Sequence, residues 1–488
     1  MKRLIVCCDG TWNSATEVKD GVPTPTNVVK FRNALSELDE RGFEQRVYYH
    51  PGVGVGVDIF DKLVDGATGR GLSRNIQSAY KWLSDNYYPD ANDEIFVLGF
   101  SRGAFTVRSL VGLLAHCGLP LKTDWNVVEE AYDLYRLDPQ AKETVAAQAQ
   151  FRIKHHADPG PSIAFLGVWD TVGALGIPKD LDWLGLAAEK FEFHNTTLSP
   201  AVRIARHAIA IDELRANFSP TLWTAQAAHQ DVKQVWFPGV HCDVGGGYRE
   251  TGLSDGALSW MIREAASAGA AFKEAMVTQV RPTPRDVLHD SYTGMFHVAR
   301  CQPRPIPCIV KGSMGPTGQS IHESALERVE APPIEQAPYR ETTILSVGNS
   351  KQVSIYARDF WNWTGIYLQA GAEYSFVATG SWQDAHYTTG PEGMEGGLVH
   401  WLGASTKRID GAPWFCLGCA IGDADNPDNE GNPRPMTTFA VGDGLLRLSI
   451  GKAGYLYGFA NDVVAPFGET ALYRNNRGSV QMEVTRIR

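Results

Sequence analysis

A strand-forming run, Glu94 to Leu98, leads into Gly99-Phe100-Ser101-Arg102-Gly103, and a helix-forming run, Ala104 to His116, follows directly. This order of strand, Gly-x-Ser-x-Gly and helix is the pattern of a nucleophile elbow, a sharp turn that presents a serine hydroxyl. Glycines two residues before and after the serine remove the Cβ atoms that would collide in such a turn. We therefore predict that Ser101 is a nucleophile at the edge of a β-sheet.

A second copy of the pattern, Gly252-Leu253-Ser254-Asp255-Gly256, lies in a different context. A glycine-rich stretch precedes it instead of a strand, and a helix-forming run from Ala257 to Ala268 follows. Serine is a favoured residue at the start of a helix, so Ser254 is predicted to be a helix N-cap. A nucleotide-binding turn at Ser101 is disfavoured, because neither a phosphate-loop lysine nor Gly-x-Gly-x-x-Gly follows the strand.

Strand-like and helix-like runs alternate through the first half of the chain. Alternation of this kind predicts the α/β class, with a mostly parallel sheet that is covered by helices on both faces. Ligands of such sheets bind at the carboxyl ends of the strands. The expected strands are 3–8, 45–50, 94–98, 162–169, 204–211 and 234–237; the expected helices are 27–38, 74–87 and 104–116, with two more between 126 and 155.

The pattern changes towards the C-terminus. Residues 311–342 combine proline, glycine and polar residues with little periodicity, which predicts a linker. From residue 343 onwards, short alternating runs are separated by Gly, Asp and Asn turns, which predicts an all-β sandwich. We expect an α/β-hydrolase domain at 1–310 with a cap-like helical segment at about 119–161, a linker at 311–342, and the β-sandwich at 343–488.

The composition of the 488-residue chain is that of a globular protein, with 43% hydrophobic and 20% charged residues. Its net charge of −10 argues against nucleic acid as a partner. The apolar run Leu4 to Cys8 is too short for a signal peptide, and no stretch of about 18 apolar residues predicts a membrane span. We expect a protein that is cytoplasmic when made, with any export following a route that reads no such signal.

A serine nucleophile needs a base, and the base needs a carboxylate that orients it. In elbow-type hydrolases the chain order is serine, then Asp or Glu, then His. Asp170 follows the strand 163–169, and His241 follows the strand-like run 235–240, so both should emerge at the edge that holds Ser101. The sequence therefore predicts a triad of Ser101, Asp170 and His241, which needs no cofactor.

Backbone N–H groups would hold the oxyanion of such a reaction. One is expected from Arg102, directly after the nucleophile, and another from Gly10 or Thr11, in the loop after the first strand. Asp9 and Asp170 can also be interpreted as turn or capping residues, and His241 as a core histidine.

Three further histidines compete for the role of the base. His289 lies in a polar loop that could approach the site, and is a rival base. His207 lies in the middle of a strand, which favours a core or supporting role, whereas His50 ends the second strand and is expected near the pocket.

Four motifs in this order resemble those of an uncharacterised α/β-hydrolase domain family that includes type VI secretion phospholipase effectors. They are 8–13, 99–104, 167–173 and 237–248. The resemblance covers about residues 1–300 and implies a Ser101–Asp170–His241 triad that hydrolyses acyl esters, with phospholipids as substrates in the effector branch. Cys242 stands where family members typically have serine, beside the base.

The C-terminal region resembles the galactophilic calcium lectin fold of PA-I type, in the segments 370–382, 390–393, 461–462 and 475–479. In that family an aspartate and two neighbouring asparagines supply oxygen ligands to calcium, which holds sugar hydroxyls. The resemblance implies Asp462, Asn475 and Asn476 as calcium ligands, with turn residues of a β-sandwich as the alternative. The segment after Gly393 departs from the sugar-contacting pattern of the family.

Two functions from different classes follow. The first is a serine hydrolase that cleaves carboxylic esters, with lipid or phospholipid substrates, through an acyl-enzyme. The second is a carbohydrate- or surface-binding protein whose hydrolase domain is vestigial, with a glycan or a membrane surface as partner. Reaction with a serine-directed probe separates the two hypotheses.

Overall fold

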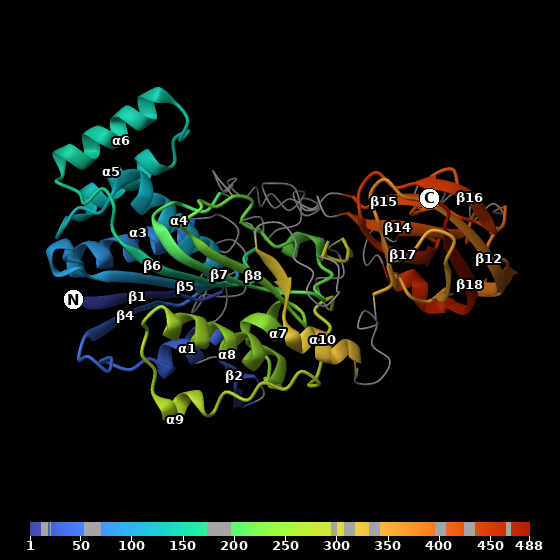
Figure 1. Cartoon of the computed structure of the whole chain (residues 1–488), viewed down its shortest axis with the longest axis horizontal. Coiled ribbons are helices and arrows are strands. Elements are labelled where there is room, and N and C mark those ends of the chain that lie inside the picture. Colours follow the sequence, from blue (N-terminus) through green and yellow to red (C-terminus); the bar gives the residue numbers. More distant parts are fainter. Residues whose placement is uncertain are drawn as a thin grey trace.

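The computed structural model describes residues 1–10, 18–19, 21–52, 70–172, 197–293, 300–306, 318–330, 342–395, 407–423, 435–464 and 470–488. Figure 1 shows an α/β domain that carries the N-terminus and, beside it, a smaller β domain that carries the C-terminus.

A seven-stranded parallel sheet forms the centre of the first domain, in the order β4-β1-β5-β6-β7-β8-β9. The predicted α/β class is confirmed. β9 lies inside the segment that was expected to be a linker, and it adds a strand to the edge of the sheet. The strands are β1 (Lys2–Cys8), β4 (Glu44–His50), β5 (Glu94–Phe100), β6 (Ile163–Trp169), β7 (Val202–Ala210), β8 (Asp231–Phe237) and β9 (Gln319–Ile321).

Helices cover both faces of this sheet, as Figure 1 shows. Along β1, Leu4 and Val6 pack into the apolar core beneath α3 and α4, whereas Ile5 and Cys7 pack beneath α1 and α8. Successive residues of a strand face opposite sides, so a strand buried on both faces is apolar throughout. The longer helices are α1 (Asn27–Ala34), α3 (Arg70–Asn86), α4 (Arg102–Cys117), α5 (Trp125–Tyr135), α6 (Lys142–Lys154), α8 (Gly252–Ser267) and α10 (Glu323–Glu330).

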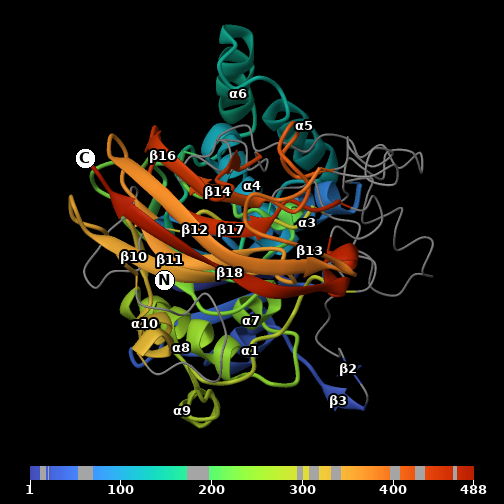
Figure 2. The same cartoon turned by 90° about the vertical axis from the view of Figure 1, so that its right-hand side faces the viewer.

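The helical segment at 119–161 does not cap the site. Its helices, α5 and α6, pack against the C-terminal half of α4, where the Cys117 thiol lies 3.3 Å from the Ala131 carbonyl oxygen and Arg152 donates to the His116 carbonyl. Figures 1 and 2 show α6 projecting from the body on that side. The expectation of a cover over Ser101 was wrong, because the apolar face of α5 is buried on α3 and α4.

Helix α8 begins earlier than predicted, at Gly252, with Thr251 as its N-cap residue. A carboxylate from a distant segment supports this start, because Asp286 Oδ2 accepts a hydrogen bond from the Gly252 N–H at 2.8 Å. Ser254 is therefore not the N-cap. It lies buried in the first turn, where its Oγ donates to the Thr251 carbonyl oxygen at 3.0 Å.

The second domain is the predicted all-β sandwich. Its antiparallel sheets run β10-β18-β12-β13, with β16 also paired to β12, and β11-β17-β14-β15. Apolar side chains from both sheets form one core between them. Figure 2 shows the sandwich on the side that faces the viewer. The strands are β10 (Ser350–Tyr356), β11 (Asn362–Leu368), β12 (Glu373–Asp384), β13 (Tyr387–Thr389), β14 (Leu417–Asp423), β15 (Thr437–Ala440), β16 (Gly444–Ser449), β17 (Gly454–Ala460) and β18 (Asn476–Arg486).

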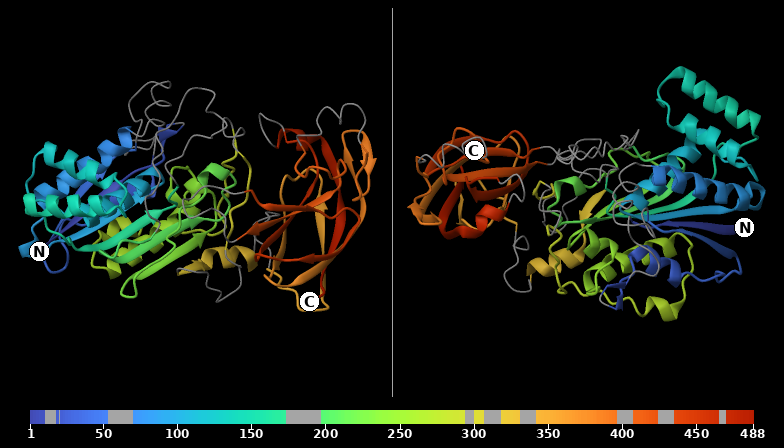
Figure 3. Two further views of the ribbon diagram at one scale, coloured as in Figure 1. Left: turned by 90° about the horizontal axis from the view of Figure 1, so that it is seen from above. Right: turned by 180° about the vertical axis from the view of Figure 1, so that it is seen from behind.

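The two domains share an apolar cluster. Ile209, Trp236 and Ile306 from the first domain pack with Trp363 and Tyr457 from the second, in one set of buried residues. Figure 3 shows the sandwich set against the end of the parallel sheet, seen from above and from behind. The carboxyl ends of the strands therefore point towards the second domain.

Candidate active site

Ser101 occupies a strained turn between β5 and α4. Its backbone angles are φ 56° and ψ −121°, a conformation that L-residues rarely adopt and that tends to occur at functional sites. A Cβ atom on Gly99 would lie 2.4 Å from the Gly103 carbonyl oxygen, and one on Gly103 would lie 2.1 Å from the Cys8 carbonyl oxygen. Both glycines are thus required by close backbone approach, as the motif predicts.

Asp170 lies beside this turn, because Phe100 and Trp169 are paired in register at the ends of β5 and β6. The Asp170 side chain is completely buried. Its Oδ1 accepts a hydrogen bond from the Ala210 N–H at 2.9 Å, and its Oδ2 lies 2.6 Å from His241 Nδ1. The structure therefore brings the predicted acid and the predicted base into contact.

His241 is the first residue of the short helix α7 (His241–Gly245), in the loop after β8. Its imidazole packs against the rings of Phe100 and Phe218, with centroid distances of 4.6 Å and 5.0 Å. A Cβ atom on Gly245 would lie 1.9 Å from the Phe100 ring, so glycine is needed there for α7 to approach the elbow. Burial lowers the pKa of His241 and outweighs Asp170, which acts to raise it. The lowered pKa favours a neutral imidazole.

Sequence reasoning missed Arg304, whose guanidinium binds the Asp170 carboxylate. Its two terminal nitrogens donate to Asp170 at 2.6 Å and 2.9 Å, and one of them also donates to the Ala210 carbonyl oxygen at 2.7 Å. Burial alone would raise the pKa of Asp170, but Arg304 and His241 outweigh it and hold that pKa well below its usual range. A buried carboxylate requires such a partner, yet no local pattern shows which of the distant arginines supplies it.

A second buried ion pair supports His241, the predicted base. Glu213 accepts hydrogen bonds from the Arg215 guanidinium at two oxygens, both at 2.8 Å, and from the His241 backbone N–H at 3.3 Å. Burial would raise the pKa of Glu213, but Arg215 lowers it to about 2. The carboxylate is therefore ionised and fixes the backbone at the start of α7.

The expected oxyanion donors Arg102 and Gly10 have different surroundings. Arg102 is the first residue of α4, so its N–H belongs to the positive end of the helix dipole. The Gly10 N–H instead donates to Asp9 Oδ1 at 2.8 Å, which engages it within its own loop. Thr11 lies outside the described residues.

Asp9 is more than a turn residue. It is buried, and its Oδ2 accepts hydrogen bonds from the Thr26 hydroxyl at 2.9 Å and the Tyr49 hydroxyl at 3.0 Å. Burial raises the pKa of Asp9 to about 6, although these hydrogen bonds act to lower it. Asp9 thus ties the loop after β1 to α1 and β4.

The rival histidines have other partners. His289 Nδ1 lies 2.6 Å from Asp243 Oδ1, and its ring stacks on Tyr248 with a centroid distance of 3.8 Å. His207 is completely buried and accepts a hydrogen bond from the Thr171 N–H at 3.1 Å, as expected of a supporting residue. His50 Nδ1 lies 2.7 Å from the Pro51 carbonyl oxygen.

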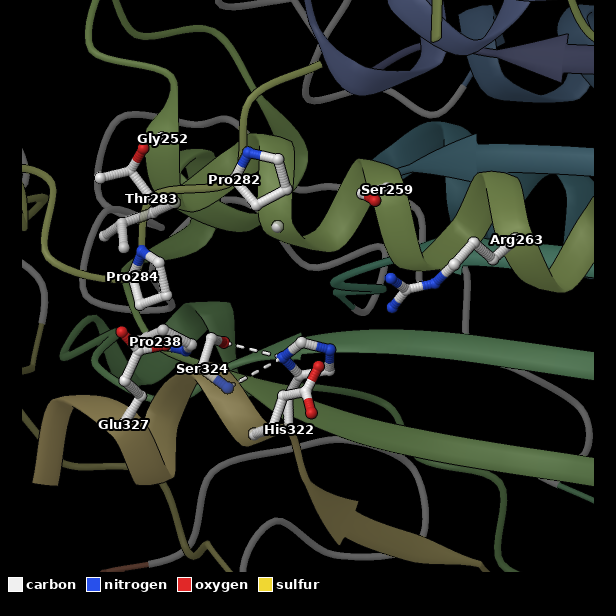
Figure 4. A pocket seen from close by; sticks show the side chains of 13 residues that line it. Pro238, Gly252, Ser259, Arg263, Pro282, Thr283, Pro284, His322, Ser324 and Glu327 are labelled. Atoms are coloured by element: carbon white, nitrogen blue, oxygen red, sulfur yellow. Dashed lines mark hydrogen bonds between the residues drawn. The ribbon is translucent and has the colours of Figure 1, made fainter. Parts of the chain in front are cut away.

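A pocket of about 260 Å³ lies between α8 and α10 and contains none of the triad residues. Figure 4 shows Arg263 and His322 directed into it. His322 Nδ1 accepts a hydrogen bond from the Ser324 N–H at 3.2 Å, so its other nitrogen carries the proton. Pro238 lines this pocket and belongs to the loop that leads from β8 to His241.

The residues implied as calcium ligands also come together in part. Asn476 Nδ2 donates to Asp462 Oδ2 at 2.9 Å, whereas Asn475 Nδ2 donates to Asp384 Oδ1 at 2.9 Å. Asp384 and Asn476 are paired in register between β12 and β18, so the four side chains belong to one end of the sandwich. Burial raises the pKa of Asp462 to about 6, and the nearby Asp384 adds to this increase.

The comparisons with known proteins agree with the fold and motifs. Residues 2–264 match the family model described as the catalytic domain of type VI secretion phospholipase effectors of the Tle1-like kind. The chain belongs to this family. It is also 31% identical, over 243 residues, to the uncharacterized protein YEL023C of Saccharomyces cerevisiae, covering 46% of this chain. The chain spans about a third of that relative, since 33% of its length is matched.

Two solved structures are more distant neighbours. One is the Tle1 effector bound to the VgrG spike of the type VI secretion system, with a TM-score of 0.27, 19% identity, and 51% coverage of each chain. The other is the N-terminal domain of EclA, a PllA-like lectin, with a TM-score of 0.20 and 20% identity, covering 28% of this chain and 94% of that one. In the described part of the chain, no helix is both long and apolar enough to cross a membrane.

Proposed function

We propose that the chain is a serine hydrolase that cleaves carboxylic esters of lipids or phospholipids. The observation that carries this proposal is the buried contact of 2.6 Å between His241 and Asp170, next to the strained turn at Ser101. Membership of a phospholipase effector family supports a lipid substrate. It also supports delivery to the substrate by a secretion route that reads no signal peptide.

The reaction would proceed in two stages. Because Nδ1 of His241 is held by Asp170, its Nε2 is the nitrogen that removes the Ser101 proton as the Oγ attacks the ester carbonyl. The oxyanion would be stabilised by the Arg102 N–H, and His241 would then protonate the departing alcohol. In the second stage His241 would deprotonate a water molecule, which releases the acid and restores Ser101.

Replacement of Ser101 by alanine tests this proposal, and the second Gly-x-Ser-x-Gly motif supplies the control. Ser101→Ala should fold normally and lose hydrolysis of short p-nitrophenyl esters and phospholipid vesicles by about 10⁴-fold or more, because no other group forms the acyl-enzyme. Ser254→Ala removes only a hydroxyl in the first turn of α8 and should keep most of the activity. Equal activity of Ser101→Ala and wild type contradicts the proposal.

The pH dependence of kcat/KM follows from the environment of the base. Hydrolysis requires a neutral His241, and burial lowers the pKa of this residue from its usual value of 6.5. Activity should therefore be retained at pH 6.5 and fall only at lower pH, as His241 becomes protonated. The profile is measured with a soluble ester between pH 4 and pH 8. An acid limb centred above pH 7 is the opposing result.

A second candidate function is calcium-dependent binding of a glycan or membrane surface by the β-sandwich. The observation that favours it is Asn476 Oδ1, a buried acceptor that receives no hydrogen bond from the described residues, next to the Asp462 carboxylate. Two carboxylates and two amides supply the hard oxygen ligands that calcium requires. Among the described residues, no three His, Cys, Asp or Glu side chains form a metal cluster, so calcium would depend on the asparagines. Asp384, Asp462, Asn475 and Asn476 would hold it.

Calcium titration by calorimetry tests this second function without reference to hydrolysis. Wild type should bind one ion, and Asp462→Asn should weaken binding at least tenfold, because it removes a charge from the ligand set. Binding should raise the melting temperature of wild type by mass action. Asp443→Asn, at a turn of the same sandwich, is the control. The absence of calcium binding by folded wild type would exclude the site.

A further inference from the structure

Arg304 lies on a short segment, residues 300–306, that contacts both domains. Towards the catalytic domain, the Ala216 N–H donates to the Arg300 carbonyl oxygen at 2.9 Å, and the Gln302 N–H donates to the Leu214 carbonyl oxygen at 2.7 Å. These bonds align the segment antiparallel to residues 214–216, with a bridge between Arg215 and Cys301. The segment is thus fixed next to the ion pair that holds the backbone of His241.

The β-sandwich holds the same segment from its other side. The Trp361 indole N–H donates to the Cys301 carbonyl oxygen at 2.9 Å. Cys301 is buried with Phe360 and Tyr473, and Ile306 packs with Trp363 and Tyr457. Two residues separate Cys301 from Arg304, whose guanidinium binds both oxygens of Asp170. A continuous path of contacts therefore leads from the sandwich to the carboxylate that orients His241.

The sandwich contacts the segment 300–306 over part of its length. A cavity of about 530 Å³ lies between the domains, lined by Cys301, Arg304 and Ile306 on one side and by Trp361 and Trp363 on the other. Because this space separates much of the segment from the sandwich, the position of the segment depends on the Trp361 hydrogen bond and on the packing of Cys301 and Ile306.

We propose that the β-sandwich positions the catalytic acid and base, with Trp361 holding the segment 300–306 and Arg304 acting as the positioning residue for Asp170. This inference rests on the proposed function for its effect on turnover. It assigns the second domain a role in the hydrolase site that is separate from any glycan or calcium binding. Displacing Arg304 would leave Asp170 less constrained and would move a cation away from the imidazole.

The charged groups around His241 determine the sign of the effect. Asp170 and Glu213 favour the protonated imidazole, whereas Arg215 opposes it, and Arg304 compensates the charge of Asp170. Moving Arg304 away should therefore stabilise the imidazolium by Coulomb attraction to an uncompensated carboxylate. The pKa of His241 should rise, and the acid limb of the pH profile should move to higher pH.

The test compares two tryptophans whose indole N–H groups each donate a hydrogen bond to a backbone carbonyl oxygen. In the full chain, Trp361→Phe removes the hydrogen bond to the Cys301 carbonyl oxygen. Trp382→Phe removes an equivalent bond of 2.9 Å to the Phe415 carbonyl oxygen inside the sandwich. Trp361→Phe should lower kcat with KM unchanged, by up to about a hundredfold, as expected for a misplaced catalytic group. It should also shift the acid limb upward, in the same direction as Arg304→Lys.

A second measurement keeps the inference testable if the protein does not hydrolyse esters. The proton between His241 Nδ1 and Asp170 should give a downfield NMR signal in wild type, assigned by its loss in His241→Gln. Trp361→Phe should shift or broaden this signal, and Trp382→Phe should leave it unchanged. If Trp361→Phe and Trp382→Phe give the same signal and the same pH profile as wild type, the inference is wrong, whether or not the proposed hydrolysis is found.

Discussion

Replacing Arg304 with methionine is expected to destabilise the fold by about 3–5 kcal/mol at neutral pH. The reason is that Asp170 is completely buried and would keep its charge without the guanidinium that binds both of its oxygens. The free energy of unfolding is measured by urea denaturation. Arg447→Met, which breaks an exposed pair with Glu373 in the sandwich, should leave stability nearly unchanged.

The pH dependence of this loss has a definite sign. The pKa of Asp170 is depressed in the folded state, so the ion pair contributes stability above the unfolded pKa of about 3.8 and loses it as the pH falls. The difference in the free energy of unfolding between wild type and Arg304→Met should therefore become smaller below about pH 4. In an Asp170→Asn background the same substitution should cost less, because the buried charge is absent. A loss that is independent of both pH and Asp170 contradicts the ion-pair account.

Asp170→Asn is expected to have the largest effect on turnover apart from loss of the nucleophile. An asparagine amide at this position can donate to His241 Nδ1, which moves the ring proton to Nε2 and prevents that nitrogen from accepting the Ser101 proton. We expect kcat to fall by about 10⁴-fold in protein that remains folded. Stability is measured in parallel, since Arg304 would then lack its carboxylate partner.

The matched variant for this prediction is His289→Gln. His289 also lies 2.6 Å from an aspartate, Asp243, and it was the rival base on sequence grounds. If His241 is the base, His289→Gln should cost less than about tenfold in kcat, because it removes a group with no role in proton transfer. A loss as large as that of Asp170→Asn would make His289 the base.

Much of the fold and the meeting of Asp170 with His241 were predictable from the sequence. Buried parallel strands read as apolar runs, and residues directly after such strands gather at one edge of the sheet. Asp170 and His241 follow β6 and β8 in this way, and the order of the chain predicts which of them is the acid and which the base. The glycines around Ser101 could be explained in advance by the turn that they permit.

The remaining features depend on contacts that no local pattern records. Arg304 lies 134 residues from Asp170 in the chain, and β9 is only three residues long, too short for a periodic signal. The early start of α8 depends on the Asp286 carboxylate, and the Gly10 N–H is engaged by Asp9. Each difference arises from a long-range or geometric partner, not from an error in local propensity.

Labelling with a fluorophosphonate probe tests the central claim, that Ser101 is an activated nucleophile, most directly. Wild type at neutral pH should react, and peptide mass spectrometry should place the adduct on Ser101. The label should disappear in Ser101→Ala and persist in Ser254→Ala. An adduct on another residue, or no reaction of folded wild type, would contradict the account and leave the β-sandwich as the functional part of the chain.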